Sequence, residues 1–191
     1  MIADAFAYAV FFVVIALTYA LICLGLNLQW GFTGLFNVGV AGFVAVGAYT
    51  SAILTASASA ERVVGPVWPI AVGWLGAVAT AGAVALGVGV VTLRLRHDYL
   101  AIATFGVAVT IQLLATNLVA LTGGPFGIHG VPRPFTGLIA SPLGRNAAYL
   151  AVVVALVAAV YLALDRLVRS PWGRVLRGLR EDEAAASALG K

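Results

Sequence analysis

The chain has 191 residues, of which 62% are apolar and only 9% are charged, and its formal net charge is +4. A composition this apolar is typical of a membrane protein and argues against a soluble globular domain. The apolar runs contain no Asp, Glu, Lys, Arg or His, and no polar segment is long enough to hold an active site, so the sequence predicts no enzyme, no metal site and no cofactor.

Five apolar runs predict membrane-spanning helices, because each approaches the roughly 20 residues that a helix needs to cross a bilayer. The runs are continuous rather than alternating, which favours helices over the strands of a barrel. We therefore expect an all-α fold, a polytopic membrane helix bundle forming a single transmembrane domain over residues 1–191. The expected spans are residues 5–28, 40–58, 67–91, 99–121 and 147–164.

The stretch between the first two spans, residues 31–39, is uncharged, rich in glycine and dotted with polar groups. Two interpretations are open. It forms either a tight turn between two spans, or irregular backbone at membrane depth, which is tolerated only where protein or a water-filled cavity surrounds it.

Small residues recur at every fourth position of the third span, which predicts a ridge for close packing against another helix. The ridge consists of Gly73, Ala77, Ala81, Ala85 and Gly89.

The fourth span carries two pairs of polar residues, each on one helix face. Gln112 and Thr116 lie one turn apart, and Thr110 and Asn117 lie two turns apart. Polar side chains in a membrane helix either bond a neighbouring helix or line an aqueous path. Both roles are open for each pair.

Residues 122–137 contain five Gly and three Pro, which predicts an irregular loop. The loop lacks the Lys-Ser/Thr of a phosphate-binding loop. His129 has no cysteine or acid nearby in the sequence, so we expect a loop residue rather than a metal ligand.

Residues 165–191 are the only long, strongly charged stretch. Ser170 before Pro171 predicts a helix start, since the serine side chain can accept a hydrogen bond from an unpaired amide and proline suits the first helical position. The helix is amphipathic. It is interpreted either as a basic helix lying on anionic lipid headgroups or as a docking helix for a soluble partner. Its apolar face carries Trp172, Val175, Leu176 and Leu179, with Arg174, Arg177 and Arg180 away from the centre of that face.

Residues 170–190 resemble the cytoplasmic coupling segment of bacterial ABC importer permeases, whose Glu-Ala-Ala…Gly signature seats in a groove of the ATPase subunit. Ala185 and Gly190 fit the spacing, and Glu183 stands one position early. Residues 25–54, residues 93–104 and the Thr-Gly-Gly-Pro-x-Gly-Ile run from Thr122 are similar to LivM-type branched-chain amino acid permeases.

The resemblance implies a permease subunit of an ABC importer for branched-chain amino acids in the bacterial inner membrane. It further implies two cytoplasmic ATP-binding subunits, a second homologous permease subunit and an external solute-binding protein as partners, and no nucleic acid. The implied ATPase-coupling residues are Trp172, Arg174, Leu176, Leu179, Glu183, Ala185 and Gly190.

Gln112 and Thr116 are our candidates for the solute path, because a primary amide can both donate to and accept from a zwitterionic amino acid. Three other functions remain open. The chain is an ABC permease for another small polar solute such as urea or a short amide, a sodium-coupled secondary transporter, or a structural membrane subunit that transports nothing.

Eight of the 11 Lys and Arg residues fall on the side of the coupling segment and three on the other, which predicts a cytoplasmic coupling segment. With five spans, Met1 then lies outside. LivM-type permeases continue past this segment with further membrane helices, so we expect the chain, which stops at Lys191, to be incomplete at its C-terminus.

Overall fold

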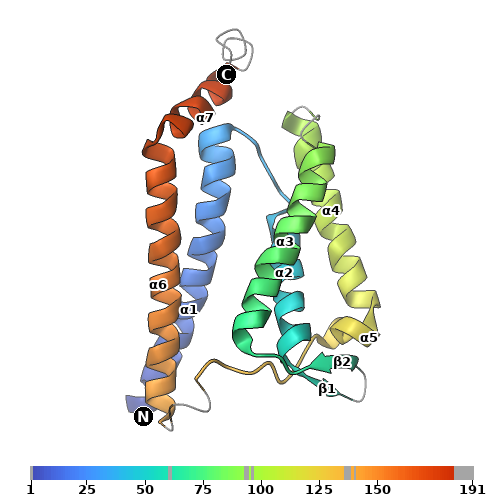
Figure 1. Ribbon diagram of the computed structural model, residues 1–191, viewed down its shortest axis with the longest axis vertical. Coiled ribbons are helices and arrows are strands. Elements are labelled where there is room, and N and C mark those ends of the chain that lie inside the picture. The colour runs from blue at the N-terminus through green and yellow to red at the C-terminus, as the bar shows by residue number, and fades with distance from the viewer. Residues whose placement is uncertain are drawn as a thin grey trace. The chain divides into compact units, whose positions relative to one another are not determined.

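The computed structural model describes residues 2–59, 62–92, 95, 97–135, 139 and 141–182 (Figure 1). The all-α membrane bundle is confirmed. Four helices among these residues are long and apolar enough to cross a membrane, and the shorter apolar helix α2, Val40–Thr55, makes a fifth element of the same kind. The four long segments are Ala5–Phe32, Ile70–Thr92, Tyr99–Asn117 and Pro142–Arg169.

Large apolar side chains lie on the outside of these helices. Tyr8 is 76% exposed and Val78 is 74% exposed, and the most apolar stretch of Pro142–Arg169 has no buried residue. A water-soluble protein rarely exposes so much contiguous apolar surface. Lipid or neighbouring helices must therefore cover it, as expected of a multi-pass membrane protein.

The chain forms two compact units, one from Met1–Leu35 with Pro134–Lys191 and the other from Phe36–Arg133. In the first unit, α1 (Ile2–Leu26) is extended by the π-helix η1 (Asn27–Phe32) and lies beside α6 (Pro142–Arg169).

The helices α1 and α6 run in the same direction (Figure 1). One groove between them is lined by Leu17 and Val154, and a second, further along both helices, is lined by Phe32 and Val168. Two parallel spans require an odd number of crossings between them. The three helices α2, α3 and α4 meet that requirement and agree with five spans.

The expected fifth span, residues 147–164, is too short at both ends. The helix begins at Pro142, because the Ser141 hydroxyl accepts a hydrogen bond from the Gly144 amide at 3.4 Å and proline occupies the first turn. At the other end, an Asp165–Arg169 ion pair one turn apart, at 2.8 Å, supports the last turn.

In the second unit, α2 packs against α3 (Ile70–Thr92), and the predicted ridge of small residues is confirmed as part of that interface. A Cβ atom on Gly47 of α2 would lie 3.7 Å from the Ala81 side chain and 3.8 Å from that of Ala77. The Thr80 hydroxyl also donates to Thr50 of α2 at 2.9 Å. No atom lies within 4 Å of such a Cβ at Gly89, so the ridge extends beyond its partner helix.

The segment between α2 and α3 differs from expectation. The helix α2 ends at Thr55 rather than at residue 58, and the chain forms an antiparallel pair, β1 (Ser57–Ser59) and β2 (Arg62–Pro66). The next helix starts at Ile70, because the Pro69 carbonyl accepts from the amides of its first turn. The expected span over residues 67–91 therefore began too early.

The fourth span is also shorter than expected. The helix α4 (His97–Asn117) breaks at Leu118 and is followed by the short helix α5 (Val119–Thr122) and the 3₁₀ turn η2 (Gly124–Phe126). The break is held by the Thr122 hydroxyl, which donates to the Ala115 carbonyl at 2.6 Å. Left-handed backbone at Gly123, with φ of 76°, then begins the predicted irregular loop.

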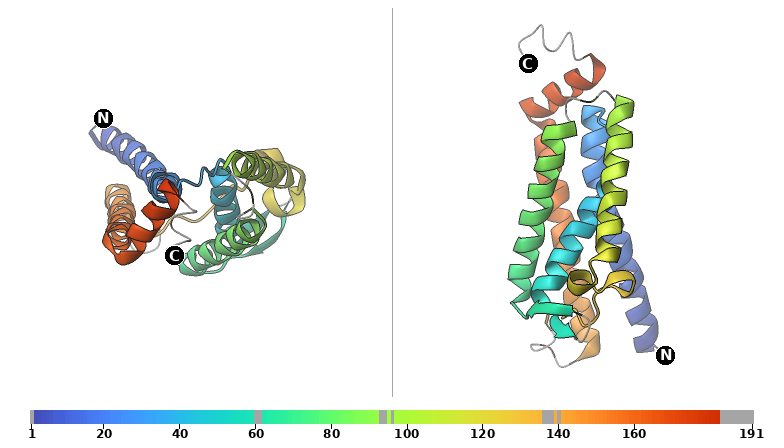
Figure 2. Two further views of the ribbon diagram at one scale, coloured as in Figure 1. Left: turned by 90° about the horizontal axis from the view of Figure 1, so that it is seen from above. Right: turned by 90° about the vertical axis from the view of Figure 1, so that its right-hand side faces the viewer.

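The first turn of α2 is recessed within its unit. Thr104 lies beside Gly39 and Ala108 beside Gly42, so α2 begins about 10 Å along α4 at roughly 1.5 Å per residue. The right-hand view of Figure 2 shows α2 starting short of the ends that α3 and α4 reach. Residues 36–39 therefore run as non-helical backbone alongside an apolar span, which favours the second interpretation of residues 31–39.

Protein groups satisfy this backbone, as membrane depth requires. The Val38 amide donates to the Thr104 hydroxyl at 3.2 Å, and the Gly39 amide donates to the Asn37 side-chain oxygen at 2.8 Å. Thr104 is only 3% exposed and also donates to the Leu100 carbonyl at 2.9 Å. It fixes the position of α2 along α4.

We expect Gly39→Ala to destabilise this unit by about 1–3 kcal/mol, the usual cost of overpacking. The added Cβ would stand 2.6 Å from the Thr104 carbonyl oxygen, which is backbone and cannot rotate away. Thermal unfolding in detergent measures the loss. The matched control is Gly106→Ala, where the new Cβ meets no atom within 4 Å. Equal melting temperatures for the two variants would contradict the close α2–α4 contact.

Candidate coupling site

The charged C-terminal stretch forms the helix α7 (Pro171–Glu181), separated from α6 by one extended residue, Ser170. The predicted helix start is confirmed, with proline in the first turn. The predicted capping role of the serine side chain is wrong. Its hydroxyl donates backwards to the Leu167 carbonyl at 2.6 Å and so supports the end of α6 instead.

A sharp bend joins α6 to α7, and Gly173 makes it possible. Gly173 is buried, and a Cβ atom at this position would overlap the carbonyl oxygen of Val168. Its amide donates to the Ser170 carbonyl at 3.1 Å. No side chain other than hydrogen fits here, so the bend that sets the direction of α7 depends on this glycine.

The predicted apolar face is present on α7, and its members differ in exposure. Trp172 is 67% exposed, whereas Leu176 and Leu179 are half-buried. Arg174 is exposed on another side of the helix. Three more predicted coupling residues lie outside the residues that the structure describes: Glu183, Ala185 and Gly190.

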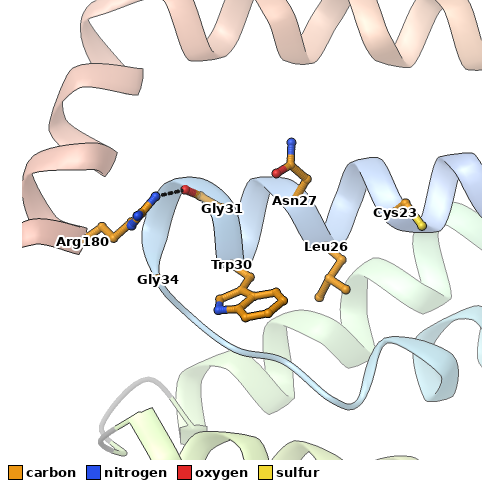
Figure 3. A pocket seen from close by; sticks show the side chains of 7 residues that line it. All are labelled: Cys23, Leu26, Asn27, Trp30, Gly31, Gly34 and Arg180. Atoms are coloured by element: carbon orange, nitrogen blue, oxygen red, sulfur yellow. Dashed lines mark hydrogen bonds between the residues drawn. The ribbon is translucent and has the colours of Figure 1, made fainter.

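Sequence reasoning missed the contact of this helix with the end of α1, which Arg180 makes. Its Nη1 donates to the carbonyl oxygen of Gly31 in η1 at 2.6 Å (Figure 3). The two residues belong to the same compact unit but lie 149 positions apart in sequence. No motif marks the pair. The only signal in the sequence was a basic residue in the last turn of an amphipathic helix.

Arg180 closes one side of an open hollow of about 470 Å³ beside the end of α1. Figure 3 shows the Arg180 side chain reaching η1, with Trp30 of η1 and Leu26 at the end of α1 close by. The hollow is lined by Cys23, Leu26, Asn27, Trp30, Gly31, Gly34 and Arg180.

The candidate pathway residues Gln112 and Thr116 are both exposed on α4. The Thr116 hydroxyl donates to the Gln112 main-chain carbonyl at 3.1 Å. The Thr110 hydroxyl and the Asn117 amide likewise bond carbonyls of their own helix, at 2.8 and 2.7 Å. These back-bonds lower the cost of placing the groups in an apolar setting and leave the choice between path and packing open. Among the side chains of this span that the structure describes, Thr104 is the polar one with a hydrogen bond to another segment.

Comparison with known proteins gives a family match over residues 8–191, to the model described as branched-chain amino acid transport system / permease component. The chain is also similar to the high-affinity branched-chain amino acid transport system permease protein LivM of Escherichia coli (strain K12). The identity is 36% over 200 residues, covering 92% of this chain and 44% of that protein.

Two further relatives carry related names. The LivM protein of Salmonella typhimurium (strain LT2) is 35% identical over 90% of this chain and 44% of its own length. The probable LivM permease protein of Methanocaldococcus jannaschii is 26% identical over 91% and 56%. The chain thus spans about half the length of these relatives. No solved structure matches it.

Proposed function

The chain belongs to the family of branched-chain amino acid transport permease components, and we propose that it is a membrane-spanning permease subunit of an ABC importer for branched-chain amino acids. The observation that carries the proposal is the helix α7. A short amphipathic helix with an exposed Trp172 projects from the end of a membrane span, where an ATPase subunit could receive it.

The proposal includes the partners that such a machine needs. Two cytoplasmic ATP-binding subunits supply the energy, a second homologous permease subunit completes the path, and an external solute-binding protein delivers the amino acid. Closure of the ATPase subunits pushes on residues 170–190, and the attached helices rock to open the path on alternate sides of the membrane.

We propose that the protein lies in the bacterial inner membrane with α7 in the cytoplasm. The excess of arginine near α7 supports this orientation. Because α1 runs parallel to α6, the start of α1 then lies on the outer side.

The solute is tested by uptake into proteoliposomes that hold the complete transporter, with labelled leucine and labelled urea compared. We expect leucine uptake that requires both ATP and the solute-binding protein. Urea uptake would assign the chain to another solute, and leucine uptake driven by a sodium gradient without ATP would indicate a secondary transporter.

For the path, we propose that Gln112 and Thr116 contact the solute, and we expect Gln112→Leu with Thr116→Val to lower leucine uptake about tenfold or more. A tenfold loss of uptake corresponds to about 1.4 kcal/mol, which is the order of free energy expected when polar contacts to a zwitterion are removed. The matched control is Thr110→Val with Asn117→Leu on the neighbouring face. Normal uptake with a lowered melting temperature in the first variant would make its residues packing groups instead.

A further inference from the structure

The C-terminal end of α1 is not an ordinary helix end. Six residues, Asn27–Phe32, form the π-helix η1. Such turns are rare and often occur at functional positions. The Leu35 amide donates to the Gln29 carbonyl at 3.1 Å, although in an α-helix it would donate to Gly31. The helix ends at Gly34, which is left-handed with φ of 74°, and the Leu35 amide therefore bonds the Gln29 carbonyl and not that of Gly31.

Arg180 supplies a charged donor to that carbonyl. Carbonyl groups at a helix C-terminus carry the negative end of the helix dipole, so a guanidinium is the favoured partner. Hydrogen bonds from a charged donor are stronger than neutral ones, and the Arg180 guanidinium is such a donor.

The other arginines of α7 do not make this connection. The Arg177 Nε donates to the Gly173 carbonyl at 3.2 Å, within its own helix, and Arg174 is exposed. The Arg180–Glu181 pair, at 3.9 Å with both side chains substantially exposed, holds Arg180 only weakly. Among the described hydrogen bonds, the bond to Gly31 is the one that joins α7 to α1.

We propose that Arg180 is a positioning residue for transport, which fastens α7 to the end of α1 so that both spans of the unit follow a displacement of α7. Covalent connection already ties α7 to α6 through Ser170. The Arg180 bond adds a direct connection to α1, and without it a push on α7 reaches α1 only through the packing of α1 on α6. The inference rests on the proposed function, since the push comes from an ATPase subunit.

Gly31 contributes only its main-chain carbonyl to this contact. A Cβ atom on Gly31 would overlap only the Asn27 side-chain oxygen, and this flexible side chain can rotate away. The acceptor is a main-chain atom, so no substitution at Gly31 removes the bond cleanly. The bond is therefore tested from the Arg180 side.

The experiment compares Arg180→Gln, Arg180→Lys and the matched control Arg177→Gln in the complete transporter. For Arg180→Gln we expect normal recovery of ATPase subunits but about tenfold less leucine uptake per ATP hydrolysed. A tenfold change matches the free energy of one lost hydrogen bond from a charged donor. Arg180→Lys should recover part of the coupling, because it keeps the charge but lacks the planar, multi-donor guanidinium. Arg177→Gln should behave as the unsubstituted chain.

A second readout follows the contact itself. Spin labels are placed at Tyr19→Cys in α1 and Gly178→Cys in α7, both exposed positions, in a Cys23→Ala background. We expect one narrow distance distribution that Arg180→Gln broadens and Arg177→Gln does not.

The outcomes separate the two claims. If ATPase subunits do not bind the unsubstituted chain, the proposed function fails, while the spin-label distances still test the bond. If they bind and Arg180→Gln matches Arg177→Gln in coupling or in the width of the distance distribution, the positioning role of Arg180 is overturned.

Discussion

Substitution of Gly173 by alanine is expected to cut both ATPase association and leucine uptake by at least about tenfold in the complete transporter. The new Cβ would overlap the Val168 carbonyl, so the bend between α6 and α7 must open. Overpacking of this kind costs about 1–3 kcal/mol when the structure can yield. Here the helix α7 yields by swinging away, which also separates Arg180 from Gly31.

The matched control is Gly178→Ala, on the same helix. Gly178 is exposed, and a Cβ there meets no atom within 4 Å. The change should stabilise the helix by up to about 1 kcal/mol and leave transport unchanged. Pull-down of the ATPase subunits and uptake are measured for both variants. Full activity of Gly173→Ala would show that the bend is not needed for coupling.

The double variant Trp172→Glu with Leu179→Glu is expected to abolish ATPase association while membrane insertion continues. Burial of an unpaired carboxylate in an apolar groove costs several kcal/mol, and large aromatic residues such as Trp172 commonly dominate an interface. Leu176 is less suited to this test. At about 100° per residue, it lies nearer than Leu179 to the side of α7 that carries Gly173 and Arg180, which contact the protein's own chain.

Charge alone is controlled by Gly178→Glu, which adds a carboxylate on a different side of α7. The measurement is the amount of ATPase subunit recovered with the tagged chain from solubilised membranes. Undiminished recovery of the ATPase subunit with the double variant would show that the apolar face does not contact that subunit. It would favour the alternative in which α7 lies on anionic lipid.

The spans and the packing ridge were predictable because each depends on local composition. Crossing a bilayer requires a long apolar run, and close approach of helices requires small residues one turn apart. Helix ends were less predictable. Arg145 sits inside the first turn of α6, although the expected span began at residue 147, because Ser141 and Pro142 start the helix before it.

Features that join distant segments could not be predicted. The recess of α2 depends on Gly39 meeting the Thr104 backbone, and the α7–α1 contact depends on Arg180 reaching a carbonyl 149 residues away. A carbonyl acceptor leaves no mark in the sequence, because every residue has one. The apolar face of α7 was visible as a pattern, but the residues that carry the family signature beyond Asp182 lie outside the described part.

Co-purification tests the central claim most directly. The tagged permease is extracted from native membranes in mild detergent, and the bound proteins are identified by mass spectrometry. The proposed function predicts about two ATP-binding subunits per tagged chain, each with a Gly-x-x-x-x-Gly-Lys-Ser/Thr loop, which are lost in the Trp172→Glu/Leu179→Glu double variant and kept in Gly178→Glu. A correctly inserted permease recovered without any ATP-binding subunit would contradict it.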